Sequence, residues 1–299
     1  MRTVTMMKSK NSAIALLLLS SFSFSLMQSV VKLSSAQIGT FQQVFFRNLI
    51  CLFVSLFFLL KRRNSLFPPR QYLIPVAARS FFGFLGVAAL FIAASNARQA
   101  DVSLLNRTSP VWVTLFSCLI LREKISRIQV PVIVLCLLGA VLAMRPSFDS
   151  AVTPLLFALL SAVSSGIAYT MIAFCKGAVD PFCVIFNFSL FSVILAGLLM
   201  IPSYVSPSPY DLMMLLIIGL LGASGQICLT FAYQKAPASE VSIYNYSGIL
   251  FAAVFGRLFF GEELRWSTAA GAVLIVGASV LAYFCTRTDS GSNTGSQKK

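Results

Sequence analysis

Long apolar stretches alternate with short polar links along the whole chain. Ten stretches run for about the 20 residues that a helix needs to cross a bilayer, with few charges inside them. Their bounds are 13–31, 41–60, 77–94, 102–121, 128–144, 152–174, 182–201, 212–232, 241–260 and 268–284. They are apolar all round, without the alternation of a β-barrel strand, and buried backbone must bond within each segment. The pattern therefore predicts an all-α membrane protein with ten transmembrane helices.

Composition supports this prediction. The 299 residues are 58% hydrophobic and 11% charged, whereas a soluble domain is about 25% charged. The net charge of +14 does not indicate nucleic acid binding, because most Lys and Arg stand in the short links, as topology signals do. The expected surroundings are a lipid bilayer, and no nucleic acid partner is expected.

The distribution of basic residues predicts an orientation. With the N-terminus in the cytoplasm, most basic links face the cytoplasm, as the positive-inside rule requires. We therefore expect a multi-pass protein of the cell membrane with both termini cytoplasmic. The first apolar stretch is interpreted as a retained helix and not as a signal peptide. Residues 1–12 form the cytoplasmic N-terminus in this interpretation, and the Ser- and Gly-rich residues 286–299 form a disordered cytoplasmic tail.

The second half of the chain repeats the first. The aligned pairs share a Gly, Asn or Glu at fixed spacing, which chance matching of apolar helices does not produce. They are Gly83 with Gly222, Gly86 with Gly225, Asn106 with Asn245, and Glu123 with Glu262. We infer two five-helix repeats, residues 13–146 and 147–285. Because five is odd, the second repeat enters the membrane from the opposite side, which gives the inverted repeats common in secondary transporters.

These motifs resemble the drug/metabolite transporter superfamily, in its ten-helix EamA type. The resemblance rests on Arg47 in FFRNL, on the paired glycines, on LNRTSP around Arg107, and on the glutamates of LREK and FGEEL that end the repeats. It covers about residues 13–285. It implies a ten-helix bundle around a central cavity, alternating access, and small organic metabolites as substrates.

Charged residues inside the predicted helices point to a binding site. A charge near the membrane centre costs ~2.5–3.5 kcal/mol, so it usually faces a cavity or a partner. Arg47 and Arg107 are candidates for bidentate binding of a carboxylate or phosphate. The alternatives are that Arg47 braces neighbouring helices and that Arg107 snorkels to the outer surface. Arg79 is placed near the inner start of its helix, outside the site.

The remaining candidates are polar side chains at membrane depth. With the two arginines, the predicted substrate site comprises Asn106, Tyr169, Gln226, Tyr244 and Asn245. Interhelical bridging is the competing role for the two asparagines. Pro110 should kink its helix and form a gating hinge. Glu123 and Glu262 are expected to cap or pair at helix ends, for instance Glu123 with Arg127, in a structural or gate-locking role.

These features favour a secondary transporter for an amino acid or another small zwitterion or anion, with export slightly favoured by analogy. Efflux of lipophilic cations is the alternative, but no carboxylate lies at mid-membrane to pair with a cation. A non-transporting scaffold or receptor is the alternative of another class. The chain has no His, no CxxC pair and no paired buried acids, so we expect no enzyme activity, metal or cofactor. A homodimer is compatible with the sequence.

Overall fold

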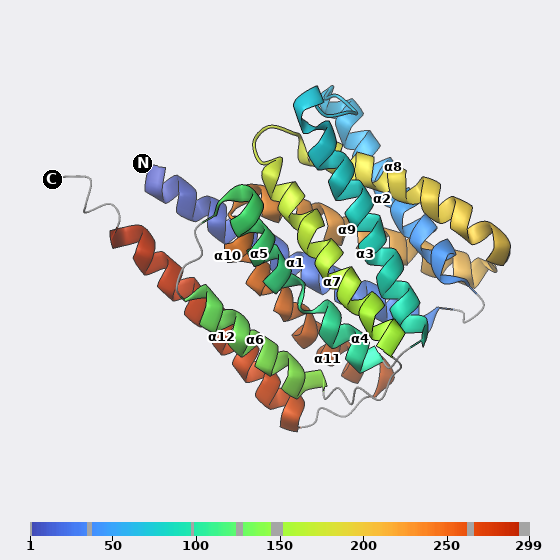
Figure 1. Cartoon of the computed structure of the whole chain (residues 1–299). Helices are drawn as coiled ribbons and strands as arrows, with labels where there is room; N and C mark the ends of the chain where they lie inside the picture. Colours follow the sequence, from blue (N-terminus) through green and yellow to red (C-terminus); the bar gives the residue numbers. More distant parts are fainter. Residues whose placement is uncertain are drawn as a thin grey trace.

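A computed structural model describes residues 2–34, 38–96, 99–123, 128–144, 152–261 and 266–292, and these form helices joined by short links. Both chain ends lie on the same side of Figure 1. In the first half the helices are α1 (Arg2–Leu33), α2 (Thr40–Arg62), η1 (Arg70–Tyr72), α3 (Leu73–Asn96), α4 (Gln99–Asn106), α5 (Ser109–Leu121) and α6 (Gln129–Met144). In the second half they are α7 (Val152–Phe174), α8 (Pro181–Met200), η2 (Ile201–Ser203), α9 (Pro209–Lys235), α10 (Ala238–Val241), η3 (Ser242–Tyr246), α11 (Ser247–Phe260) and α12 (Trp266–Ser292).

The protein is a multi-pass membrane protein. Seven segments of the described chain are helical, long and apolar enough to cross a bilayer, and two shorter apolar helices cover 129–142 and 269–281. Large apolar side chains stand on the outside of these helices, among them Phe53, Leu119 and Val273. In water such a surface would be unfavourable, but lipid tails accept it. The full count of ten crossings stays a prediction.

Two of the predicted helices are interrupted. The stretch 102–121 breaks at Arg107 and Thr108, between α4 and α5. Pro110 stands in the first turn of α5, where its missing N–H leaves no hydrogen bond unmade. The stretch 241–260 is interrupted as well, because η3 separates α10 from α11. The two interruptions occupy equivalent positions in the sequence repeat.

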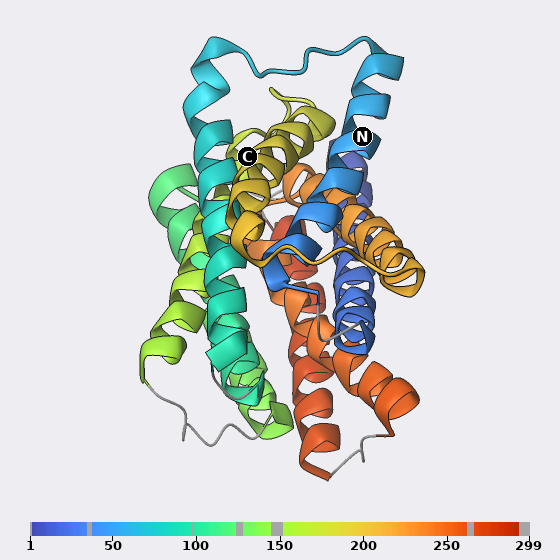
Figure 2. The ribbon, with the colours of Figure 1, turned by 90° about the vertical axis from the view of Figure 1, so that its right-hand side faces the viewer.

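Helix pairing follows the repeat. α1 packs on α9 and α3 on α7, while α2 packs on α8 and α6 on α12. In the repeat, α1 corresponds to α7 and α3 to α9, so the contact of α1 with α9 is equivalent to the contact of α3 with α7. Likewise α2 corresponds to α8 and α6 to α12, so each of the last two contacts joins a helix to its own counterpart. Figure 2 shows the link from α2 to α3 passing over one end of the bundle, and α8 packs against both of these helices. This pairing is what two similar halves related by a pseudo-two-fold axis would produce.

Two boundaries differ from expectation. α3 begins at Leu73, before the predicted start at residue 77, because Pro75 is tolerated in a first helical turn. Arg79 therefore lies about two turns inside the helix and not at its inner start. α12 continues to Ser292, past the point where a disordered tail was expected, since extending an existing helix adds one hydrogen bond per residue without a new nucleus.

Candidate solute-binding site

Three arginines from different elements lie around Tyr169 of α7. Arg47 of α2, Arg79 of α3 and Arg107 after α4 each interact electrostatically with Tyr169. Arg79 and Arg47 also interact with each other, whereas Arg107 interacts with Tyr246 of η3. Arg47 and Arg79 thus form a pair of neighbouring charges, and Arg107 shares only Tyr169 with them. Within the described part of the chain, none of the three forms an ion pair with a carboxylate.

Arg79 is the most deeply buried of these groups, with 2% of its surface exposed. Its guanidinium lies 4.1 Å from the ring centroid of Phe188 in α8. Neither Nε nor Nη1 has a hydrogen-bond partner. Sequence reasoning missed this residue because it started the helix too late. The signal was present, since Pro68 and Pro69 end the preceding link and the apolar residues resume at Leu73.

Arg47 is held between α1 and α9. Its guanidinium lies 5.4 Å from the ring centroid of Phe24, and its Nε has no hydrogen-bond partner. The stem of the side chain passes over Gly222 of α9, where an added Cβ would lie 2.7 Å from the arginine Cγ. Glycine at that position therefore makes room for the arginine.

Arg107 joins the two helix interruptions. Its Nη1 donates a hydrogen bond to the backbone oxygen of Asn245 in η3, at 3.2 Å. An added Cβ at Gly248 of α11 would lie 2.5 Å from the same Nη1. The Arg107 guanidinium thus connects the helix interruption of the first repeat to that of the second. Its other N–H groups can donate hydrogen bonds to a ligand.

A tyrosine pair connects Asn245 to the arginines. The side-chain amide of Asn245 donates to the hydroxyl of Tyr233 in α9 at 3.0 Å. Tyr233 is fully buried and stacks on Tyr169 with 5.1 Å between the ring centroids. Tyr233 was not among the predicted site residues, because nothing in the sequence around it indicates its contacts with Asn245 and Tyr169. The structure therefore brings together four predicted residues, namely Arg47, Arg107, Tyr169 and Asn245.

The other three predicted binding residues make different contacts. The Asn106 side chain donates to Ser161 Oγ of α7 at 2.9 Å, so it bridges two helices. Gln226 donates to Thr230 Oγ1, one turn along α9, at 3.1 Å. Tyr244 lines an apolar pocket of about 320 Å³ with residues of α1, α11 and α12. Bridging was the competing interpretation of Asn106.

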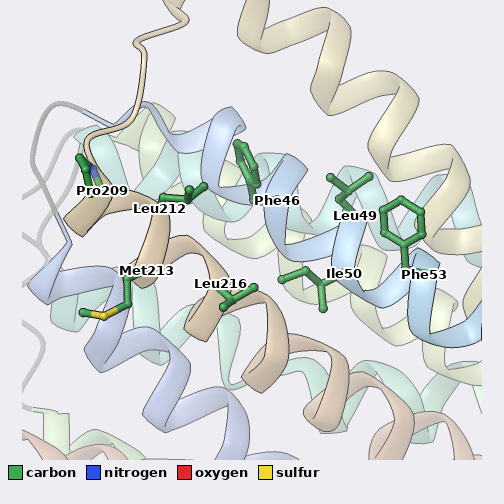
Figure 3. Close-up of a pocket in the computed structure, with 8 residues that line it drawn as sticks. All are labelled: Phe46, Leu49, Ile50, Phe53, Pro209, Leu212, Met213 and Leu216. Atoms are coloured by element: carbon green, nitrogen blue, oxygen red, sulfur yellow. The ribbon is translucent and has the colours of Figure 1, made fainter.

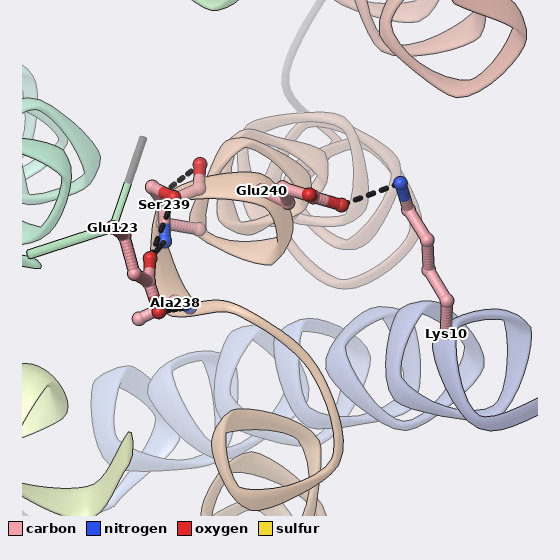
Figure 4. Close-up of polar contacts among 6 residues, drawn as sticks. Lys10, Glu123, Ala238, Ser239 and Glu240 are labelled. Carbon is pink, nitrogen blue, oxygen red and sulfur yellow. Dashed lines mark hydrogen bonds and ion pairs between the residues drawn. The ribbon is translucent and has the colours of Figure 1, made fainter. Parts of the chain in front are cut away.

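Glu123 binds the start of α10. Its carboxylate accepts hydrogen bonds from the backbone N–H groups of Ala238 and Ser239, both at 3.1 Å, and from the Ser239 hydroxyl at 2.7 Å (Figure 4). An anion at a helix N-terminus satisfies N–H groups that have no partner within the helix. Nearby, Lys10 of α1 pairs with Glu240. The expected partner Arg127, and Glu262 of the second repeat, lie outside the described residues.

A larger pocket lies on the outside of the bundle. It has a volume of about 520 Å³ and runs between α2 and α9. Figure 3 shows Phe46, Ile50 and Leu216 among its apolar lining. Its chemistry suits a lipid chain, and it contains none of the arginines.

Comparison with known proteins adds to this picture. Residues 11–145 and 152–284 each match the EamA-like transporter family. The chain is 34% identical over 271 residues to the pseudopaline exporter CntI of Pseudomonas aeruginosa, covering 90% of this chain and 95% of the relative. It is 26% identical to human solute carrier family 35 member G1, covering 88% of this chain and 76% of the relative.

A solved structure has the same fold. A crystal structure superposes with a TM-score of 0.78 over 94% of this chain and 98% of the other, at 18% sequence identity. At that identity the likeness describes the arrangement of helices and nothing of the cargo.

Proposed function

Because the chain belongs to the EamA-like transporter family, we propose that it is a secondary transporter for a small organic anion or zwitterion, such as an amino acid, in the cytoplasmic membrane. The names of the family and of its relatives indicate a transporter and not an enzyme. One relative is named an exporter, which supports outward transport.

The observation that carries the proposal is the sign of the buried charge. Arg47, Arg79 and Arg107 lie around Tyr169, and no described carboxylate pairs with them. A buried cation without a counter-charge is costly. An anionic group on the solute would supply that counter-charge, whereas a lipophilic cation would be repelled.

Alternating access is proposed from the repeat. The two halves pair in a pattern that is unchanged when they are exchanged, and each contains an interrupted helix at the equivalent position. Inverted repeats with broken helices at the binding site are typical of secondary transporters. In this scheme Pro110 marks a hinge, and Glu123 locks the cytoplasmic end.

The test compares Arg107→Gln with Arg257→Gln, an exposed arginine of α11, in proteoliposomes and in thermal-shift screens. Candidate solutes are amino acids, organic acids and lipophilic cations. We expect flux of an anion or zwitterion that falls at least about tenfold in Arg107→Gln, because a charge-assisted hydrogen bond contributes about 1.5–3 kcal/mol. The control should keep its flux.

Each alternative has its own outcome. Stabilisation by lipophilic cations alone, retained in Arg107→Gln, would favour cation efflux. No flux of any solute by well-folded protein would favour a scaffold or receptor.

A further inference from the structure

The site holds more positive charge than one anionic group would balance. Arg47 of α2 and Arg79 of α3 are close enough for their charges to act on each other, and both helices pack on α8. Arg107 acts on Tyr169 as they do, and also on Tyr246. Two like charges at close range repel, and inside a bilayer there is little water to screen them. The pair therefore needs a counter-charge of its own, apart from whatever Arg107 binds.

The protein does not supply this counter-charge in its described part. Arg79 is 2% exposed and its Nε and Nη1 are unpartnered, and the Nε of Arg47 is unpartnered as well. Each guanidinium lies over an aromatic ring, that of Phe188 for Arg79 and that of Phe24 for Arg47. A cation over a ring gains about 0.5–2 kcal/mol, which is less than the cost of burying a charge.

Glycines hold both side chains in place. An added Cβ at Gly83 would overlap Arg79 Nη1 and lie 2.9 Å from the ring of Phe188, and one at Gly222 would lie 2.7 Å from Arg47 Cγ. These two glycines occupy the same position in the two repeats. The repeated glycine thus does more than let helices approach, because in each half it makes space for one arginine of the pair.

We propose that the solute carries at least two anionic groups, one held between Arg47 and Arg79 and a second bound by Arg107. The groups are carboxylates or phosphates, both of which match the planar fork of a guanidinium. Tyr169 is the group that all three arginines share as an electrostatic neighbour. This inference rests on the proposed function and narrows its substrate class from zwitterions and anions in general to polyanions.

The experiment measures binding to the purified full chain with matched solutes. Glutarate and tricarballylate carry two and three carboxylates, and butyrate is the single-carboxylate reference. 3-Phosphoglycerate against glycerate tests whether the second group can be a phosphate. We expect the polyanions to bind at least about tenfold more tightly than their monoanionic references, since each adds charge-assisted hydrogen bonds.

The variants test the place of the second subsite. Arg79→Gln should remove the preference for a second anionic group, so that the polyanions bind no more tightly than their monoanionic references. Gly83→Ala should have the same effect without removing a charge, because its Cβ displaces the movable tip of Arg79. Gly277→Ala of α12 is the matched control, since nothing lies within 4 Å of its added Cβ.

Equal binding of mono- and polyanions, no binding of any polyanion, or a preference unchanged in both Arg79→Gln and Gly83→Ala would overturn the inference. In that case, flux of a zwitterion with a single carboxylate would still support the proposed transport function. Conversely, polyanion binding that depends on Arg79, without flux of any solute, would support the inference of a polyanion site and reject the proposal of transport.

Discussion

At the scale of single residues, the arginines of the site differ in whether the protein supplies a hydrogen-bond acceptor for their N–H groups. Arg107 has a backbone acceptor in Asn245, whereas Arg79 has none for its Nε and Nη1. Tyr233 contacts two residues that neighbour the arginines: its hydroxyl accepts a hydrogen bond from Asn245, and its ring stacks on Tyr169. We therefore assign Tyr233 a positioning role.

The Tyr233→Phe variant tests this role. It removes the acceptor of the Asn245 amide and keeps the stacked ring, so we expect the unfolding free energy in detergent to fall by about 1 kcal/mol. Solute affinity should fall as well, since Asn245 also holds Arg107. Tyr210→Phe, at an exposed tyrosine of α9, is the control and should change neither quantity. Equal stability of Tyr233→Phe and the parent protein would show that the Asn245 amide finds another partner.

The arginines also show where sequence reasoning succeeded and failed at this scale. Arg47 and Arg107 could be selected because each stands inside an apolar run, where a charge needs an explanation. Arg79 was missed because a shift of four residues in a helix boundary moves a side chain by a full turn. Partners such as Ser161 for Asn106 are far apart along the chain, and no local pattern encodes them.

At the scale of elements, the interrupted helices are the parts that a hydrophobic pattern describes least well. Periodicity located the apolar stretches and most of their ends, because burial in lipid requires continuous helix. It did not predict η3, where Ser, Tyr and Asn interrupt the apolar run and the hydrogen bonding changes from α to 3-10. α10 is only four residues long, too short to be stable alone, so its geometry depends on Glu123.

The Glu123→Ala variant should release this short helix. The carboxylate accepts bonds from two backbone N–H groups, and each such charge-assisted bond contributes about 1.5–3 kcal/mol. We expect the amides of Ala238 and Ser239 to exchange hydrogen at least about tenfold faster, as measured by mass spectrometry of the peptides that contain them. Glu240→Gln breaks the nearby ion pair with Lys10 and keeps the acceptor, so its exchange should stay close to that of the parent. Unchanged exchange in Glu123→Ala would rule out a locking role.

At the scale of the whole molecule, the pairing of helices carries the symmetry that the repeated motifs suggested. α1 on α9 and α3 on α7 are equivalent contacts under exchange of the halves, and so are α1 on α11 and α7 on α5. The arginines break this symmetry, since Phe186 and Ile218 stand where a duplicate of Arg47 or Arg79 would be. In the proposed alternating-access cycle, the two similar halves would exchange conformations while the solute stays at one charged site.

The predicted inverted topology assigns each link between helices to one side of the membrane. Ser65, in the link after α2, should face the cytoplasm, and Ser206, in the link before α9, should face outward. Both serines are exposed, so Ser65→Cys and Ser206→Cys form a matched pair for labelling with a membrane-impermeant maleimide on intact cells. We expect Ser206→Cys to react from outside and Ser65→Cys to react only after the membrane is opened.

Background from native cysteines should be low in this experiment. Of the six cysteines other than Cys285, five are buried and Cys118 is half-buried. Cys175, which lies in the link between α7 and α8, has a pKa of about 12, raised by burial and then by the neighbouring Cys183. Its thiol therefore stays protonated at neutral pH, and the thiolate that attacks maleimide is scarce. The parent chain without an added cysteine is the control. Labelling of Ser65→Cys on intact cells, with Ser206→Cys protected, would invert the topology and move the Glu123 lock to the outer face.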